Sequence, residues 1–266
     1  MGAFKIATWN VNSLKVRLPQ VLEWLAAEQP DILALQELKI PTEIFPFDEL
    51  RRAGYEAVVN GQKTYNGVAL LYRNVMPENI LIEFSELQDP QRRMIAATFN
   101  DVRVVNLYVP NGESVHSEKY QYKLNWLKHL KLFLTNEKKQ YSNIILLGDF
   151  NIAPQNEDVY DPMACEGKVL FSLPERAEFE ALLDLDFKDC FRLRSQPEKS
   201  FSWWDYRLNS FKRNLGLRID HILASAKLAK HCKQCRIDKT PRGWERPTDH
   251  APVVAEFSEY ICHLIY

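Results

Sequence analysis

Residues 144–151 read Ile-Ile-Leu-Leu-Gly-Asp-Phe-Asn, an apolar run that ends in an acid and an amide. Such a run is typical of a buried strand that delivers polar side chains to its end. Because strand side chains alternate between faces, we expect Asp149 and Asn151 to project to the same side. A carboxylate beside an amide suits phosphate chemistry, since one orients or deprotonates a water and the other hydrogen-bonds a developing oxyanion. The ordinary alternative is a strand-end turn.

The composition of the chain favours one large domain, although 266 residues also fit two small ones. Apolar residues make up 46% of the chain, which is ample for a core, and no apolar run approaches the length of a membrane span. No Gly/Ser linker or composition shift marks a boundary. We therefore expect a single domain over residues 1–258, followed by an apolar tail, 259–266, whose role stays open.

The cysteines indicate a reducing compartment, because five of them, an odd number, are scattered along the chain. The N-terminus leads directly into a strand-like run and lacks signal-peptide features, so we expect a cytoplasmic protein. Cys232 and Cys235 have the spacing of a zinc or redox pair. No second pair matches it, and Cys262-His263 would complete a zinc site only by coincidence of folding.

Helix and strand patterns alternate along the chain. Apolar spacing predicts a helix over 15–28, which Pro30 stops, and a long helix over 117–139. Residues 172–175 (Ser-Leu-Pro-Glu) have the features of a helix start, and that helix should run to about Leu185. Strands are expected at 4–9, 31–36, 55–60, 67–73, 93–99, 102–109, 144–149, 217–224, 234–239 and 251–257. The simplest architecture is an α/β fold of two packed mixed β-sheets flanked by helices.

Four groups of polar residues follow or precede these strands: Asn10 and Asn12, Glu37, Asp149 and Asn151, and Asp249-His250. Each has an ordinary explanation as a turn, a surface acid or a hydrogen-bonded loop. Convergence of all four is the interpretation we favour. It predicts an active centre at the strand ends, formed by residues that are distant in sequence.

The oxygen-bearing side chains in these groups favour a hard divalent cation such as Mg²⁺, which carboxylates and substrate phosphate typically hold together. Glu37 and Asp249, helped by Asn12, have the chemistry of such a site. Zinc is disfavoured because no Cys/His ligand set lies near them. His250 would protonate or hydrogen-bond a phosphoryl oxygen, and Asp220 is the candidate that orients its imidazole.

Seven segments carry a family resemblance when they are taken together. They are Thr-Trp-Asn-Val-Asn-Ser (8–13), Leu-Gln-Glu-Leu-Lys (35–39), Tyr-Val-Pro-Asn-Gly (108–112), Gly-Asp-Phe-Asn-Ile-Ala-Pro (148–154), Phe-Ser-Trp-Trp-Asp-Tyr-Arg (201–207), Gly-Leu-Arg-Ile-Asp (216–220) and Asp-His-Ala-Pro-Val (249–253). In this order they resemble the exonuclease III family of abasic-site endonucleases, within the endonuclease/exonuclease/phosphatase superfamily. Each string is weak alone, but seven in order are specific and cover essentially the whole chain.

The resemblance implies a four-layer α/β sandwich and Mg²⁺- or Mn²⁺-dependent hydrolysis of phosphodiesters in DNA. Glu37 would be the metal carboxylate, with Asp249, Asn10 and Asn12 around it. Some relatives carry Asp where this chain has Asn12, and a neutral ligand there should weaken metal binding.

The resemblance also implies which residues act on the phosphate. Asp149 would position or deprotonate the attacking water, and Asn151 would bind the phosphate. Tyr108 would act at the phosphate or at the leaving group. His250, paired with Asp220, would stabilise the pentacovalent transition state.

A further part of the resemblance concerns substrate selection. Aromatic residues in a short apolar run are usually core, but the family places one at Trp203, in the wall of a pocket for a flipped-out sugar without a base. Leu217 and Ile219 fall at other wall positions, and Asn111 belongs to the same substrate-binding set. An apolar slot that accepts bare deoxyribose but has no room for a base would select abasic sites by exclusion.

A net charge of −1 is not typical of a nucleic-acid-binding protein, although local basic clusters could still line one groove. Arg207, Lys212, Arg213 and Arg218 surround the pocket segment. We expect them to hold phosphates of double-stranded DNA, which would make binding salt-sensitive.

Three hypotheses for function follow from the sequence. The leading one is a bacterial-type DNA repair nuclease, a monomer that cuts 5′ to abasic sites, trims 3′ ends and removes 3′ blocking groups such as phosphate. It would be cytoplasmic, and on the nucleoid when bound to DNA. The second is a phosphodiesterase of the same superfamily acting on phospholipid or inositol phosphate, against which stand the missing export signal and disulfides. The third is a non-catalytic DNA-binding relative, which the competent side chain at every catalytic position disfavours.

Overall fold

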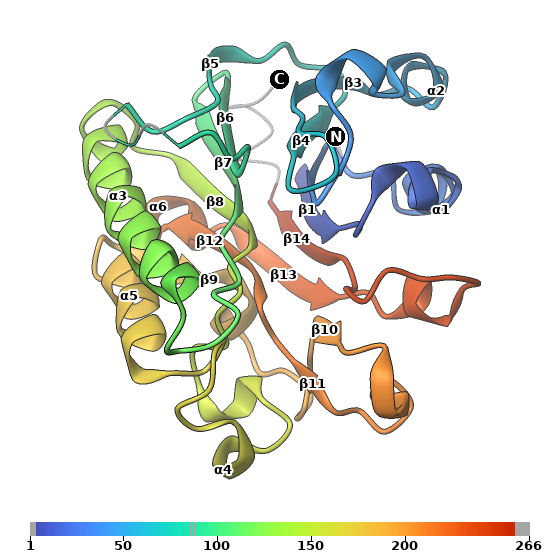
Figure 1. The fold of residues 1–266 in the computed structure, drawn as a ribbon. Coiled ribbons are helices and arrows are strands. Elements are labelled where there is room, and N and C mark those ends of the chain that lie inside the picture. The colour runs from blue at the N-terminus through green and yellow to red at the C-terminus, as the bar shows by residue number, and fades with distance from the viewer. Residues whose placement is uncertain (1–3, 86, 88, 259–266) are drawn as a thin grey trace.

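The computed structural model describes residues 4–85, 87 and 89–258, which form two six-stranded sheets with helices outside them (Figure 1). The strands of the first sheet, in spatial order, are β13 (Cys232–Ile237), β14 (Val253–Phe257), β1 (Phe4–Asn10), β2 (Ile32–Gln36), β4 (Val68–Tyr72) and β3 (Glu56–Asn60). Those of the second are β5 (Glu78–Leu81), β6 (Met94–Phe99), β7 (Val102–Tyr108), β8 (Ile144–Asp149), β12 (Asp220–Ser225) and β9 (Phe187–Asp189). Both sheets are mixed, because β1–β2 and β7–β8 are parallel pairs among antiparallel ones.

The helices are α1 (Leu14–Glu28), α2 (Phe47–Arg52), α3 (Glu118–Gln140), α4 (Pro162–Cys165), α5 (Leu173–Leu183) and α6 (Ala226–Ala229). Figure 1 shows α1 and α2 on the outer side of the first sheet, and α3 and α5 on the outer side of the second. A separate two-stranded piece, β10 (Trp203–Trp204) and β11 (Gly216–Leu217), lies beside the sandwich.

Alternation along the strands divides the core into layers. Ile145 and Leu147 of β8 join the apolar cluster between the two sheets, whereas Ile144 and Leu146 pack with residues of α3 and α5. On the other side, Trp24 of α1 packs on the outer face of the first sheet. The order helix, sheet, sheet, helix is the four-layer α/β sandwich that the family resemblance implied, so this prediction is confirmed.

Helix starts follow the local chemistry that the sequence indicated. At α5 the Ser172 side chain accepts from the backbone of Glu175, whose carboxylate in turn accepts from the Ser172 backbone, the reciprocal capping box. The helix ends at Leu183, two residues short of the prediction. The long helix α3 begins at Glu118, and Ser117 caps it by accepting from the amide of Tyr120 at 3.1 Å.

Some elements differ from the expectation. The strand predicted over 217–224 is two strands, because β11 pairs with β10 whereas β12 pairs with β8 and β9, and Arg218 and Ile219 lie between them. The short strands β5, β9 and β10 were not predicted, since two to four residues carry too little alternation to recognise. The apolar tail predicted at 259–266 lies outside the described residues. In the described part of the chain, no helix is long and apolar enough to cross a bilayer.

Candidate active site

The candidate site lies between the two sheets, where inner-face side chains change from apolar to polar. In β8 the residues that face the other sheet are apolar until the last position, Asp149, whereas in β1 the polar positions begin with Thr8 and end with Asn10. Since β7 and β8 are parallel, Tyr108 stands beside Asp149, and the antiparallel register places Asp220 on the other side of Asp149. Glu37 follows β2 directly. Strand ends from both sheets therefore meet at one point.

A buried amide pair joins the two sheets directly below the site. The Gln36 side chain donates to the Asn106 side-chain oxygen at 2.7 Å and to the Thr8 hydroxyl at 2.9 Å. Asn106, on the opposite sheet, donates back to the carbonyl oxygens of Leu35 at 3.0 Å and Ala69 at 2.8 Å. Because an unpaired buried amide is costly, these bonds fix the separation of the sheets and hence of the residues above them. Sequence reasoning missed this pair, whose only signal is a polar residue at an inward strand position.

The Asp149 carboxylate is held from three sides. One oxygen accepts from the Asn10 amide at 2.9 Å and lies 3.8 Å from His250 Nε2, and the other accepts from the backbone N–H of Asn151 at 2.9 Å. Asn10 also donates to Glu37 at 2.8 Å. One ligand atom from each of Glu37, Asp149 and His250 lies within 4.8 Å of the others. These residues, more than a hundred positions apart in sequence, converge as expected.

Gly148 explains how the backbone reaches this position. Its φ is +143°, and an added Cβ would lie 2.0 Å from the carbonyl oxygen of Leu107 on the neighbouring strand. No side chain fits in that space, so the residue before Asp149 must be glycine. After Asp149 the strand ends and Asn151 has a φ of +49°, so strand alternation does not extend to Asn151 and the turn interpretation holds for this residue.

Burial and neighbouring charge shift the pKa of both central groups. Burial raises the pKa of Asp149 to about 7, with His250 opposing and Asp220 adding to the increase. For His250 burial lowers the pKa, but the carboxylates of Asp220 and Asp149 outweigh it and raise the value to about 10. His250 Nδ1–H donates to Asp220 at 2.9 Å, and Ser202 fixes the same Asp220 oxygen through a 2.6 Å bond. A protonated imidazole has no lone pair for a metal, so His250 is a cationic donor here.

Glu37 and the asparagines next to it form an oxygen-rich site for a hard cation. Lys39 places its ammonium 2.9 Å from Glu37 Oε2 and 2.6 Å from Asn12 Oδ1. The ammonium is a stand-in for a metal ion, because it shows that these oxygens converge on a positive charge. The donor set of carboxylate and amide oxygens fits Mg²⁺ or Mn²⁺. Lys39 itself was not predicted, although it follows Glu37 by two residues in one of the matched segments.

Asp249 is engaged differently from the other proposed metal residues. One oxygen accepts from the Asn12 amide and the other from the Trp203 indole N–H, each at 2.9 Å. Burial would raise the pKa of Asp249, but His250 and the two donors, Trp203 and Asn12, bring it below its ordinary value. Asp249 is therefore a buried anion joined to Glu37 through Asn12 and Lys39.

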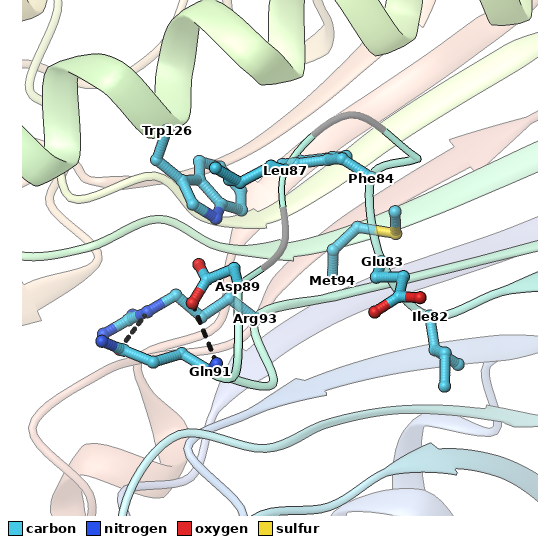
Figure 2. A pocket seen from close by; sticks show the side chains of 9 residues that line it. All are labelled: Ile82, Glu83, Phe84, Leu87, Asp89, Gln91, Arg93, Met94 and Trp126. Carbon is cyan, nitrogen blue, oxygen red and sulfur yellow. Dashed lines mark hydrogen bonds between the residues drawn. The ribbon is translucent and has the colours of Figure 1, made fainter.

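Tyr108 is kept protonated. Burial raises the pKa of its phenol well above the ordinary value, and the nearby Glu37 and Asp149 raise it further. The guanidinium of Arg93 lies 4.7 Å from the centre of the Tyr108 ring and opposes this increase. Figure 2 shows how Arg93 is anchored: its Nε donates to the Gln91 side chain, whose own backbone amide bonds to Asp89, each at 2.9 Å. The phenol is thus a hydrogen-bond donor beside two acids.

Asn151, predicted to bind the phosphate, and Asn111, predicted to bind the substrate, lie in adjacent loops. Asn111 donates to the Asn151 side-chain oxygen at 3.1 Å, and Asn151 donates to the carbonyl of Val109 at 3.0 Å. A cavity of about 830 Å³ begins here, bordered by Tyr108 and Asn111. Its other lining side chains include Tyr65, Arg93, Lys119 and Tyr122. Arg93 and Lys119 belong to basic clusters that the sequence analysis left open as the lining of a groove, whereas Tyr65 and Tyr122 were not predicted, because single aromatic residues in separate segments give no pattern.

The predicted pocket wall gathers in one small apolar cluster. Trp203 pairs with Leu217 across β10 and β11, and both pack with Ile219 and Phe171. Trp203 also forms an isolated bridge with His250, which sets the cluster beside the central acids. Leu217 is 7% and Ile219 1% exposed, so Ile219 supports the wall from behind.

The predicted phosphate contacts divide into two kinds. Arg207, Lys212 and Arg213 are exposed, and Arg207 is paired with the adjacent Asp205. Arg218 contradicts the prediction, because its side chain is 1% exposed and its guanidinium is bound to buried carboxylates, at 2.6 Å to Asp158 and at 2.8 Å to Asp189. A fully paired interior cation cannot hold DNA. The charge pattern of the sequence does not distinguish such a residue from a surface one.

Comparison with known proteins agrees with this geometry. Residues 7–250 match the Endonuclease/Exonuclease/phosphatase family. Exodeoxyribonuclease III of Haemophilus influenzae is 37% identical over 95% of this chain and 99% of its own. The 3′ phosphatase NExo from Neisseria, solved bound to a product DNA hairpin, is 48% identical with a TM-score of 0.94, covering 96% of this chain and 100% of that one. An AP endonuclease from Archaeoglobus fulgidus is 38% identical with a TM-score of 0.92, covering 96% and 99%. The chain therefore belongs to the endonuclease/exonuclease/phosphatase family.

Proposed function

We propose that this protein is a divalent-metal-dependent DNA repair nuclease, which hydrolyses phosphodiesters 5′ to abasic sites and at the 3′ ends of double-stranded DNA, and removes 3′ phosphates. The observation that carries the proposal is the convergence of Glu37, Asp149 and His250, with one carboxylate next to a cation site and the other next to an imidazolium. Relatives named as exodeoxyribonuclease, AP endonuclease and 3′ phosphatase support this reaction class. We further propose that it acts as a monomer in the cytoplasm.

Glu37, with Asn10, Asn12 and Asp249 around it, would hold Mg²⁺ or Mn²⁺. When bound, the metal would supply Lewis-acid stabilisation of charge on the phosphate. Lys39 would have to leave Glu37 as the metal enters, since both cations need the same oxygens.

The other side chains would perform the hydrolysis itself. Asp149 would take a proton from water, and a pKa near 7 suits a general base at neutral pH. The side-chain amide of Asn10 and the backbone N–H of Asn151 hold its two carboxylate oxygens in position. His250, held protonated by Asp220, would stabilise negative charge on the phosphoryl oxygens. The Tyr108 phenol would donate to the phosphate or to the leaving oxygen.

Recognition of DNA would use two surfaces. The cavity that starts at Tyr108 and Asn111, with Arg93 and Lys119 in its lining, would receive the DNA backbone. Trp203, in the wall of the apolar cluster, would contact a sugar that lacks a base. Selectivity for damage would then come from exclusion of the base.

The direct test is a nicking assay on an abasic duplex and on a duplex with a 3′ phosphate, with and without Mg²⁺. Wild-type protein should cleave both only with the metal. The isosteric Asp149→Asn variant, which keeps most of the local packing, should lose about 10³-fold in rate, the middle of the range for a missing general base. Equal cleavage by the two proteins would refute the assigned mechanism. Turnover of sphingomyelin instead of DNA would favour the lipid phosphodiesterase hypothesis.

A further inference from the structure

Next to the loops that carry Asn111 and Asn151 lies an ion pair that the proposed mechanism does not use. Lys123 of α3 and Glu175 of α5 have side chains that are both 0% exposed, and the ammonium is bonded to the carboxylate. Burial lowers the pKa of Lys123, and the Glu175 charge opposes that decrease. Because two apolar residues of similar volume usually stabilise a core as well as such a pair does, stability alone gives little reason for it.

The remaining donors of the ammonium point to another role. Lys123 Nζ donates to the carbonyl of Asn111 at 3.1 Å and to that of Asn151 at 2.6 Å. These two carbonyls belong to separate loops, one after β7 and one after β8, so a single side chain ties both loops together. Neither loop has ladder bonds at these positions, and Asn151 has a left-handed φ of +49°. An ammonium with three donors suits this geometry.

Glu175 extends the same network to the apolar cluster. Its carboxylate accepts from the backbone N–H of Leu170 at 2.9 Å and of Ser172 at 3.1 Å. Leu170 packs with the pocket-wall residues and its carbonyl accepts from the Ala153 amide at 2.7 Å. The pair thus connects the start of α5, the Asn151 loop and the Asn111 loop.

We propose that Lys123 is a positioning residue, which with Glu175 as counter-ion fixes the Asn111 and Asn151 side chains at the separation that a phosphate group requires. The part of this proposal that concerns phosphate rests on the proposed function. The part that concerns the two loops rests on the hydrogen bonds of Lys123 and Glu175 alone and can be tested by itself.

The chain offers a matched control on the same helix and strand. Glu137, near the other end of α3, pairs at 2.5 Å with Arg103, near the start of β7, and the two side chains are 7% and 1% exposed. This pair is also buried but lies at the end of β7 opposite to Tyr108. Lys123→Met and Arg103→Met therefore each break one buried ion pair, but the first also releases the two site loops, whereas the second releases the Asn79 carbonyl and the Thr98 hydroxyl, which lie away from the site.

Hydrogen exchange of the purified proteins tests the loops without reference to activity. In Lys123→Met the amides of Glu113, Asn151 and Ala153 should exchange faster by about tenfold or more, and in Arg103→Met they should be unchanged. If the Lys123→Met protein does not fold, the double variant Lys123→Met/Glu175→Gln is used instead, because it leaves no unpaired buried charge. Unchanged loop exchange in the folded variant would overturn the proposal.

Kinetics on the abasic duplex then test the link to phosphate. The kcat of the Lys123 variant should fall about a hundredfold with little change in KM, the effect of a misplacement of about 1 Å, while the Arg103→Met enzyme stays near wild type. Wild-type kcat in a variant whose loops exchange faster would overturn the positioning role. If the wild-type protein does not cleave DNA at all, the proposed function fails, and the exchange experiment still decides whether Lys123 fixes the loops.

Discussion

His221 gives a quantitative prediction about stability and pH. Its ring is 1% exposed, and burial, with a further contribution from the Arg218 charge, lowers its pKa to about 4. The hydrogen bonds agree with a neutral ring, because Nδ1 accepts from Arg218 at 3.0 Å and Nε2–H donates to the carbonyl of Ile152 at 2.8 Å. Protonation of Nδ1 would replace this acceptor with an N–H group that faces the N–H groups of the Arg218 guanidinium.

The magnitude follows from the difference between the folded and unfolded pKa. Above pH 6.5 the imidazole is neutral in both states, and its contribution to stability is fully present. Between pH 6.5 and 4 the unfolded chain binds a proton that the folded protein does not, so the free energy of unfolding falls as the pH falls. Over this window His221 alone should remove about 3 kcal/mol, at 1.36 kcal/mol for each pH unit.

Chemical denaturation at several pH values between 4 and 8 measures this effect. The free energy of unfolding of wild-type protein should decrease more steeply below pH 6.5 than that of His221→Gln, and the two curves should converge by about 3 kcal/mol at pH 4. Titrating groups that do not interact with His221 are common to both proteins and cancel in the comparison. Parallel curves would refute the assignment of a neutral, buried His221.

Four further predictions concern single residues. Gly148→Ala should lose at least about 3 kcal/mol of stability in denaturant titration, because its Cβ would overlap the adjacent strand, and near-native stability would contradict this reading. Lys39→Met should bind Mn²⁺ about threefold more tightly by electron paramagnetic resonance, since a competing cation is removed from Glu37, whereas weaker binding would mean that Lys39 supports the site. Arg207→Ala should lower the salt slope of DNA binding by about one. Arg218→Met should instead lose about 3–5 kcal/mol of stability with an unchanged slope, and a folded Arg218→Met protein with a reduced slope would restore Arg218 as a DNA contact.

The layers of the fold and the convergence of the central acids could be predicted from the sequence. Apolar strands that end in Asp149 and Asn10 predict a polar centre at one edge, because alternation fixes the inner face. The pairing of Asp220 with His250 also followed from the sequence, and the structure places them at 2.9 Å.

What the sequence missed depends on tertiary contacts between single residues. Lys123 reads as an ordinary charged residue of an amphipathic helix, and only packing of α3 on α5 buries it. Arg218 has the same charge as its exposed neighbours in sequence, but the break between β11 and β12 turns it inward toward Asp158. Lys39 becomes significant only when Glu37 and Asn12 are seen to share it. Burial of a charge is decided by the fold and leaves no local pattern.

A crystal soaked in Mn²⁺ tests the proposed metal centre most directly, through anomalous density near the carboxylate of Glu37. Our account predicts an ion at about 2.1 Å from a Glu37 oxygen, with the Lys39 ammonium displaced from it. Density that avoids Glu37 at saturating Mn²⁺, with Lys39 still bound to the carboxylate, would contradict the account.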